Sequence, residues 1–213
     1  MKSAFSHVRT WVFDLDNTLY PLHTRLFDQI EVRMTDYVVK ALGVPRPEAD
    51  RLRDHYWRQY GTTLAGLMAE HGLDPGPFLT DVHAIDFSGL TPDPALAQAI
   101  AALPGRRIVF TNGSSAYAHD VLGGRGLGQV FDAVYGVEHA GFIPKPQQAA
   151  FEAVFALDSL SPGTGAMFED DPRNLTVPHA MGMRTVLVGP DLEGQDHIHY
   201  QTNDLAGFLS QLV

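Results

Sequence analysis

Two aspartates stand two residues apart in the segment FDLDNT (residues 13–18), directly after the apolar run WVF. Burying charge is expensive, so carboxylates at the tip of a buried strand need a compensating partner. Side chains at alternate positions of a strand share one face, so Asp14 and Asp16 can act on one target. The segment alone is equally compatible with a capped turn after a strand, because Asp and Thr favour such turns.

Three later segments also end in polar residues. The run RIVFT (107–111) ends in Thr111 and continues with Asn112 and Gly113, and the run AMFE (166–169) ends in Glu169 and continues with two aspartates. Between these runs, Lys145 stands between two prolines. In open parallel sheets, ligands bind beyond the carboxyl ends of the strands. These segments are therefore predicted to bring carboxylates, a hydroxyl, an amide and an ammonium to one place.

Such a cluster needs a cation, because like charges repel. Two unit charges ~4 Å apart cost roughly 1 kcal/mol in water and about 4 kcal/mol near a protein surface. Magnesium prefers oxygen ligands and suits one or two carboxylates together with waters and a phosphate. Lysine, threonine and free backbone amides suit an anionic substrate. The pattern therefore predicts a phosphate site with a metal ion.

The order of elements predicts an α/β fold with a doubly wound parallel sheet. Strands are expected at 8–14, 107–111, 133–136, 166–169 and 185–188, and helices between and after the later ones at 95–103, 115–122, 147–157, 172–181 and 204–212. Residues 21–87 indicate helices without a strand: one from Leu26 that stops at Gly43, then 47–60, 63–71 and a short one near 78–84 after two prolines that break the chain. This helical stretch would be an insertion after the first strand.

The ordered set of motifs resembles the haloacid dehalogenase superfamily of aspartyl-phosphate phosphotransferases. The first motif, Asp-x-Asp-x-Thr, matches Asp14–Thr18, the second matches Thr111, the third Lys145, and the fourth the acidic pair that ends in Asp170. The resemblance covers nearly the whole chain. It implies a Rossmann-like catalytic core at 1–20 and 88–213 and a helical cap domain at 21–87.

The resemblance implies a covalent mechanism. Asp14 would be the nucleophile that accepts the phosphoryl group, splitting a very slow hydrolysis into two steps. Asp16 would protonate the leaving oxygen and then deprotonate the attacking water. The dehalogenases of the superfamily lack an aspartate at the position of Asp16, so this residue favours phosphate transfer over carbon–halogen cleavage.

The resemblance also assigns ligands. Mg²⁺ would be held by the Asp14 carboxylate, the Asp16 carbonyl and Asp170. Thr111 and Lys145 would bind the phosphoryl oxygens. The substrate-binding set is completed by Asn17, Thr18, Asn112 and Gly113, with backbone amides assisting. Glu169 and Asp171 keep two alternative roles, in which one holds a metal-bound water or orients the lysine.

The substrate is predicted less directly. The segments DLDNTLYP, YGTTLAGL and FTNGS look like the pyrimidine 5′-nucleotidase branch of the superfamily. The alternatives are a phosphatase of a sugar phosphate or phosphoglycolate, a phosphomutase, and a non-catalytic phospholigand-binding or scaffold protein. Candidates for reading the leaving group on the cap are Arg25, His55, Tyr56, Arg58, Tyr60, Thr62 and Thr63.

The composition of the chain argues against nucleic acids and membranes as partners. The chain has 213 residues, no cysteine and a formal net charge of −10, and it lacks basic clusters. An acidic chain is a poor ligand for nucleic-acid backbones. No apolar run approaches the roughly 18 residues of a membrane span. We expect a small phosphorylated metabolite as partner, no nucleic-acid polymer, no membrane, a monomer or homodimer, and a cytoplasmic location.

Two tempting motifs are interpreted as structural. The glycine-rich segment 123–128 lacks the spacing of a dinucleotide-binding turn and follows a predicted helix, so it is expected to be a helix stop and loop. His197 and His199 could hold a metal, but without a third nearby ligand they are expected to be surface or packed residues.

Overall fold

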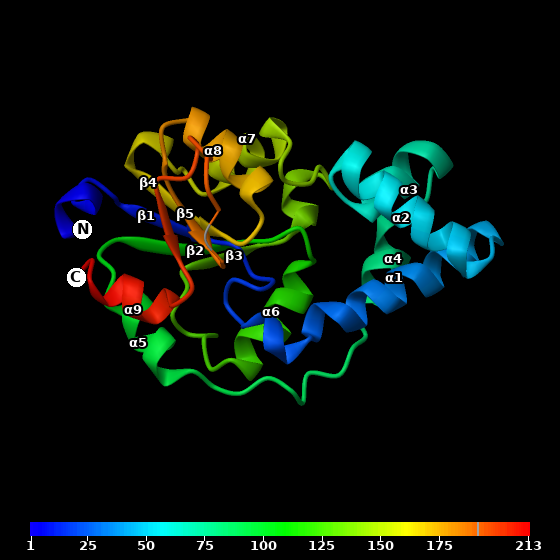
Figure 1. The fold of residues 1–213 in the computed structure, drawn as a ribbon, viewed down its shortest axis with the longest axis horizontal. Coiled ribbons are helices and arrows are strands. Elements are labelled where there is room, and N and C mark those ends of the chain that lie inside the picture. Colours follow the sequence, from blue (N-terminus) through cyan, green and yellow to red (C-terminus); the bar gives the residue numbers. More distant parts are fainter. Residues whose placement is uncertain (191) are drawn as a thin grey trace.

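A computed structural model describes residues 1–190 and 192–213. Their strands form one six-stranded parallel sheet in the order β3-β2-β1-β4-β5-β6 (Figure 1). The strands are β1 (Thr10–Phe13), β2 (Arg106–Phe110), β3 (Ala133–Tyr135), β4 (Gly165–Glu169), β5 (Arg184–Val188) and β6 (Tyr200–Thr202). The central strand β1 pairs in parallel with β2 on one side and with β4 on the other. The predicted doubly wound parallel sheet is therefore confirmed.

Helices cover both faces of this sheet, which explains why β1 is buried along its whole length. Trp11 and Phe13 point into the core cluster shared with α5 (Pro94–Ala101), α6 (Ser115–Gly124) and α9 (Leu205–Ser210). Val12 points the other way, into the cluster under α7 (Gln148–Leu157). In Figure 1, α5 and α9 lie on one side of the sheet, and α7 and α8 (Thr176–Ala180) on the other.

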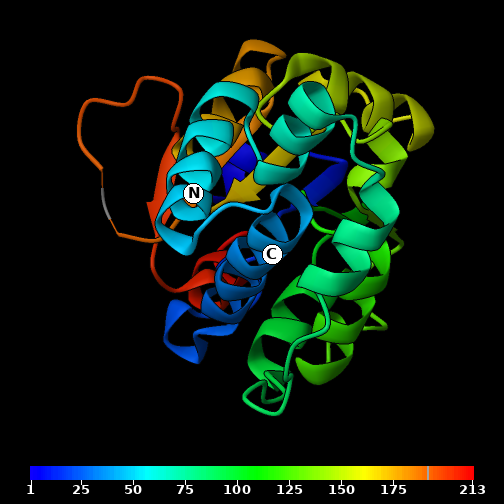
Figure 2. The same cartoon turned by 90° about the vertical axis from the view of Figure 1, so that its right-hand side faces the viewer.

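The inserted helices form a separate layer beside the sheet, which Figure 2 shows facing the viewer. They are α1 (Leu26–Leu42), α2 (Arg46–Tyr60), α3 (Thr63–His71) and α4 (Pro75–Val82). Gly43 and Gly72 end α1 and α3 with positive φ angles of 66° and 62°, the conformation that glycine adopts without a steric penalty. The predicted helical cap is therefore present. Its division from the core at residues 20 and 88 stays a prediction.

Several predicted boundaries are wrong. Pro75 and Pro77 do not break the chain but lie in the first turn of α4, where a missing N–H is harmless and Asp74 caps the helix by accepting from the Gly76 N–H at 2.9 Å. The single helix expected at 172–181 is a 3₁₀ turn followed by α8. The short 3₁₀ helices are Lys2–Phe5, Leu22–Thr24, Val137–Ala140, Pro162–Thr164 and Pro172–Leu175.

The edge strand β6 was not predicted, and the two histidines that precede it contact Thr185 of β5 and the carbonyl of Pro172. The Thr185 hydroxyl lies 2.7 Å from His199 Nδ1, and His197 Nε2 lies 2.9 Å from the Pro172 carbonyl oxygen. Their interpretation as packed residues is consistent with these contacts. Gly123 and Gly124 belong to α6, so that helix runs beyond the expected stop at 122. Among the described residues, no helix is both long and apolar enough to cross a lipid bilayer.

Candidate active site

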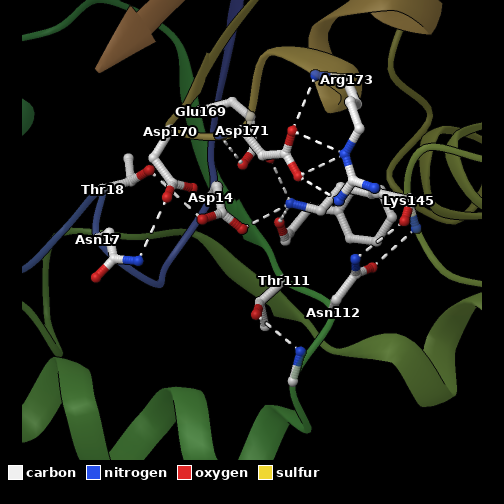
Figure 3. Close-up of polar contacts among 12 residues, drawn as sticks. Asp14, Asn17, Thr18, Thr111, Asn112, Lys145, Glu169, Asp170, Asp171 and Arg173 are labelled. Carbon is white, nitrogen blue, oxygen red and sulfur yellow. Dashed lines mark hydrogen bonds and ion pairs between the residues drawn. The ribbon is translucent and has the colours of Figure 1, made fainter. Parts of the chain in front are cut away.

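The tip of β1 carries the first acidic pair. The Asp14 N–H donates to the Phe168 carbonyl oxygen at 2.9 Å, so Asp14 still follows the ladder with β4. Its side chain is buried, with 5% of the residue exposed. Asn17 then turns the chain with a φ of 58°, a conformation that asparagine tolerates better than most residues. Figure 3 shows Asp14 pointing toward Lys145 and the acidic residues that follow β4.

Lys145 is the buried cation of the site. Its ammonium donates to Asp14 Oδ1 at 2.6 Å, to Glu169 Oε2 at 2.7 Å and to the Phe110 carbonyl oxygen at 2.9 Å. Only 1% of the residue is exposed. Burial alone would lower the pKa of Lys145, but the charges of the two carboxylates outweigh it and raise that pKa. The lysine is therefore charged, and each of its three N–H bonds has an acceptor.

Asn112 fixes the backbone of this lysine. The Lys145 N–H donates to Asn112 Oδ1 at 2.8 Å, and Asn112 Nδ2 donates to the Lys145 carbonyl oxygen at 3.1 Å (Figure 3). The Asn112 side chain thus pairs with both backbone polar groups of Lys145, as the backbone of a neighbouring strand would. Its side chain is used for this pairing, which leaves the backbone as the part of Asn112 that can meet a substrate.

Three carboxylates gather at the strand tips. Oxygens of Asp14, Glu169 and Asp170 all lie within 4.8 Å of one another. Burial, followed by the charge of Glu169, raises the pKa of Asp14 to about 8 and that of Asp170 to about 10. Asn17 Nδ2 donates to Asp170 at 3.3 Å, which offsets little of this repulsion. Three carboxylates facing one ammonium fit a divalent cation with oxygen ligands such as Mg²⁺.

The side chain of Glu169 belongs to this cluster together with the expected ligands Asp14 and Asp170. The expected contribution of the Asp16 backbone carbonyl stays a prediction. Glu169 also orients Lys145 by direct contact and accepts from the Asp171 N–H at 3.2 Å. Asp171 turns instead to Arg173, with Oδ2 2.6 Å from Nη2. Of the two residues whose roles were left as alternatives, Glu169 is the one that contacts Lys145, whereas Asp171 pairs with Arg173.

The Asp16 carboxylate faces two tyrosines. Its Oδ1 accepts from the hydroxyls of Tyr20 and Tyr117, both at 2.6 Å. Burial raises the pKa of Asp16, and the two tyrosine hydrogen bonds act in the opposite direction. The sequence gives no local signal for this arrangement, because the two tyrosines are 97 positions apart.

The remaining predicted residues lie at or below the floor of the site. Thr18 donates to Asp14 Oδ2 at 3.4 Å, and Thr111 is fully buried. Thr111 Oγ1 accepts from the Gly113 N–H at 2.9 Å, which leaves the hydroxyl proton available as a donor. Asn112 and Gly113 line the cavity above, together with Asn17. The structure thus brings the predicted set to one region, with the two threonines behind the cavity wall.

A cavity of about 700 Å³ opens between the strand tips and the inserted helices. One wall is apolar and comes from α1 and α4: Phe27, Ile30, Met34, Phe78, Leu79 and Val82. Another comes from one face of α2, where four residues follow the helical pattern i, i+3, i+4, i+7: Asp50, Arg53, Asp54 and Trp57. That helical spacing was the available sequence signal for these missed residues.

Of the seven expected leaving-group readers, Thr62 and Thr63 line the cavity. Tyr56 is wrong for that role, because it is fully buried inside the cap with its hydroxyl 2.7 Å from His71 Nε2. Trp57, the next residue in α2, instead faces the core: the Arg173 guanidinium lies 3.6 Å from the centre of its ring. This contact joins the cap to the core at the edge of the cavity, which both residues line.

The comparisons with known proteins agree with this architecture. The family model for haloacid dehalogenase-like hydrolases matches residues 8–182, which include every predicted motif. The chain therefore belongs to the haloacid dehalogenase-like hydrolases. It is 26% identical over 196 residues to phosphate metabolism protein 8 of Saccharomyces cerevisiae. That match covers 84% of this chain and 61% of the yeast protein, so the chain spans less than two-thirds of that relative.

Solved structures share the fold at low identity. A haloacid dehalogenase-like hydrolase from Streptococcus pneumoniae has a TM-score of 0.63 and 15% identity, with 98% of this chain and 100% of that chain covered. A magnesium-bound hydrolase of Bacillus subtilis has a TM-score of 0.57 and 17% identity, covering 96% and 98%. The L-2-haloacid dehalogenase of Xanthobacter autotrophicus, with chloropropionic acid covalently bound, has a TM-score of 0.52 and 21% identity. That match covers 87% of this chain and 79% of the dehalogenase chain.

Proposed function

We propose that this protein is a Mg²⁺-dependent phosphatase that hydrolyses small phosphate monoesters through a phosphoryl group carried on Asp14. The observation that carries the proposal is the environment of that carboxylate. It is buried at the tip of β1, 2.6 Å from a buried ammonium and within a cluster of carboxylates, at the floor of a cavity. Such a nucleophile accepts a phosphoryl group only where positive charge balances the incoming phosphate.

The residues divide the chemistry between them. An oxygen of Asp14 attacks phosphorus while the bond to the leaving oxygen breaks, and Asp16 gives that oxygen a proton. Asp16 then takes a proton from the water that attacks the phosphoryl group on Asp14, which restores the enzyme. Lys145 holds opposing charge beside Asp14 throughout. Mg²⁺, held by Asp14 and Asp170 with Glu169 or the Asp16 carbonyl, would stabilise the charge that develops on the phosphoryl oxygens.

Dehalogenation is the competing reaction, since several similar structures are dehalogenases. A halide leaves as a stable anion and needs no proton, whereas the oxygen of an ester does. The presence of Asp16 beside the cavity therefore supports ester hydrolysis. The acidic cluster supports it as well, because a site for a hard cation suits a phosphate better than a halide.

We propose a pyrimidine nucleoside monophosphate as the substrate. The support is the sequence resemblance to that branch together with a cavity that offers an apolar wall for a ring and polar groups beyond it. The negative charge of the chain favours a small anion held at this one site over a nucleic-acid polymer. A sugar phosphate or phosphoglycolate is the alternative with the same chemistry.

A panel of phosphorylated metabolites, measured by phosphate release with Mg²⁺ and with a chelator, tests both the phosphatase activity and the choice of substrate. We expect release to need Mg²⁺, and UMP and CMP to be turned over faster than sugar phosphates and phosphoglycolate. Equal rates for all esters would reject the pyrimidine assignment alone. A complete lack of release, including from p-nitrophenyl phosphate, would reject catalysis and leave a phospholigand-binding role.

The covalent step is tested by Asp14→Asn, which keeps the shape of the side chain and removes the nucleophile. We expect phosphatase activity to fall by about 10³-fold or more while the circular dichroism spectrum stays unchanged. Asp120→Asn is the matched control, because Asp120 is an exposed aspartate on α6. Activity of Asp14→Asn within tenfold of the unmodified protein, about 1.4 kcal/mol, would refute the phosphoryl-aspartate route.

A further inference from the structure

Two buried tyrosines converge on one oxygen of Asp16. Tyr20 and Tyr117 are 1% and 2% exposed, and both hydroxyls lie 2.6 Å from Asp16 Oδ1. Tyr20 follows the acid by one turn of chain, whereas Tyr117 comes from α6. The hydroxyls are 3.4 Å apart, so they sit side by side around the same oxygen. Two long aromatic side chains from separate segments thus end at a single carboxylate atom.

This arrangement makes the two oxygens of Asp16 different. Oδ1 already accepts two hydrogen bonds, and among the described residues Oδ2 accepts none. Both tyrosine hydroxyls are the donors in these two hydrogen bonds, so Oδ1 is engaged as the acceptor. A proton on the Asp16 carboxyl group therefore resides on Oδ2. Asp16 also lines the cavity, which is where that proton is needed.

We propose that Tyr20 and Tyr117 are positioning residues that lock the orientation of Asp16 and direct its proton to the leaving oxygen. The inference rests on the proposed phosphatase function. As the bond between phosphorus and the leaving oxygen breaks, its electron pair stays on that oxygen, which takes the proton from Oδ2. The resulting carboxylate later accepts a proton from the attacking water, so Asp16 ends each cycle protonated and both tyrosines remain unchanged.

The cap completes this arrangement through His83, the residue that follows α4. Its ring stacks on Tyr117 at 4.3 Å with an interplanar angle of 6°, and its Nδ1 lies 3.2 Å from Ser114 Oγ. Burial lowers the pKa of His83 to about 4, so the stacked ring is neutral at pH 7. On the other side, a Cβ at Gly113 would lie 2.9 Å from the Tyr117 ring. Tyr117 is thereby held between the core loop and the cap.

A series of aryl phosphates tests the proposal, because their leaving groups differ in the need for a proton. p-Nitrophenolate is a good leaving group, whereas phenolate is a poor one. For Tyr20→Phe, Tyr117→Phe and the double variant, we expect kcat/KM for phenyl phosphate to fall about 10- to 100-fold and that for p-nitrophenyl phosphate to fall less than about threefold. kcat/KM is the readout because it reports the step in which the ester bond breaks.

Tyr135→Phe is the matched control. It also removes a tyrosine–aspartate hydrogen bond, 2.9 Å to Asp158, but that bond lies outside the cavity. A second pair of variants leaves the buried hydroxyls in place: His83→Ala removes the stacking partner of Tyr117, and His83→Phe restores an aromatic ring. We expect His83→Ala to lose activity toward phenyl phosphate selectively, and His83→Phe to recover most of it.

Two outcomes would overturn the proposal. An equal loss for both esters in the tyrosine variants, and in His83→Ala, would mean that these residues serve folding alone. A gain in activity would mean that the tyrosines hold the acid away from the substrate. Failure of the unmodified protein to hydrolyse any ester in the series is a separate result, and it would refute the phosphatase function itself.

Discussion

Replacing Lys145 with methionine removes the positive charge that lies between Asp14 and Glu169. The side chain keeps its approximate length, so the change deletes three hydrogen bonds of 2.6–2.9 Å without opening a large cavity. Three clustered carboxylates then face one another without an ammonium. Because the lysine is almost fully buried, water cannot take its place as a partner for these groups.

The size of the effect follows from this burial. Removing one member of a buried ion pair costs about 3–5 kcal/mol, since the remaining charge is left uncompensated. Protonation of a carboxyl group relieves part of that cost. We therefore expect the free energy of unfolding to drop by about 3 kcal/mol near neutral pH in the absence of metal. Adding Glu169→Gln to the variant removes one of the stranded charges and should recover part of the loss.

Urea unfolding in the presence of a chelator measures this quantity, and an unchanged slope against urea shows that the comparison is sound. Lys40→Met is the matched control, because Lys40 is an exposed lysine in the last turn of α1. The control should change the unfolding free energy by less than about 0.5 kcal/mol. If Lys145→Met lies within about 1 kcal/mol of the unmodified protein, the account of the buried charge is wrong.

Two further predictions concern the metal and the cap. The folded-state pKa values of Asp14 and Asp170, about 8 and about 10, lie above the ordinary value of 3.8. Their contribution to stability is therefore present at low pH and is lost as the pH rises through those values. Mg²⁺ needs ionised carboxylates, so the rise in melting temperature that it causes should be larger near pH 9 than near pH 6, and an effect independent of pH would contradict this. At a Mg²⁺ concentration of about 100 times Kd, the gain should be about 2.7 kcal/mol. Trp57→Ala removes the ring that lies 3.6 Å from the Arg173 guanidinium, so KM should rise about 2- to 30-fold with a smaller change in kcat, as measured by steady-state kinetics. An unchanged KM would show that this contact does not shape the cavity.

The parts of the fold that sequence could predict have local causes. The helix α1 ends where Gly43 adopts a positive φ, and α3 ends in the same way at Gly72, so both stops follow from residue type alone. The convergence of the strand-end residues follows from parallel topology, since the carboxyl ends of β1, β2 and β4 meet at one edge. Strand β6 escaped prediction because its sequence, YQT, contains no apolar run, whereas the equally short β3 is AVY.

The parts of the site that the sequence did not predict depend on contacts between distant segments. Nothing near Tyr20 in the sequence indicates that its hydroxyl shares an acceptor with Tyr117. Trp57 stands in a strongly polar helix, and only the packing of the cap against the core brings it to Arg173. Pairings of this kind are set by the packing of the cap and the core, and no spacing rule along one element reveals them.

The pairing of the Asn112 side chain with the Lys145 backbone also bears on how such a protein acquires new substrates. Two hydrogen bonds tie the backbone of Lys145 to the end of β2, so the loop that carries this buried lysine is held firmly against the sheet. Much of the opposite wall is carried by side chains of α1, α2 and α4. Mutations on those helices can change which molecule fits while the reacting centre stays intact, so selectivity can diversify without rebuilding the catalyst.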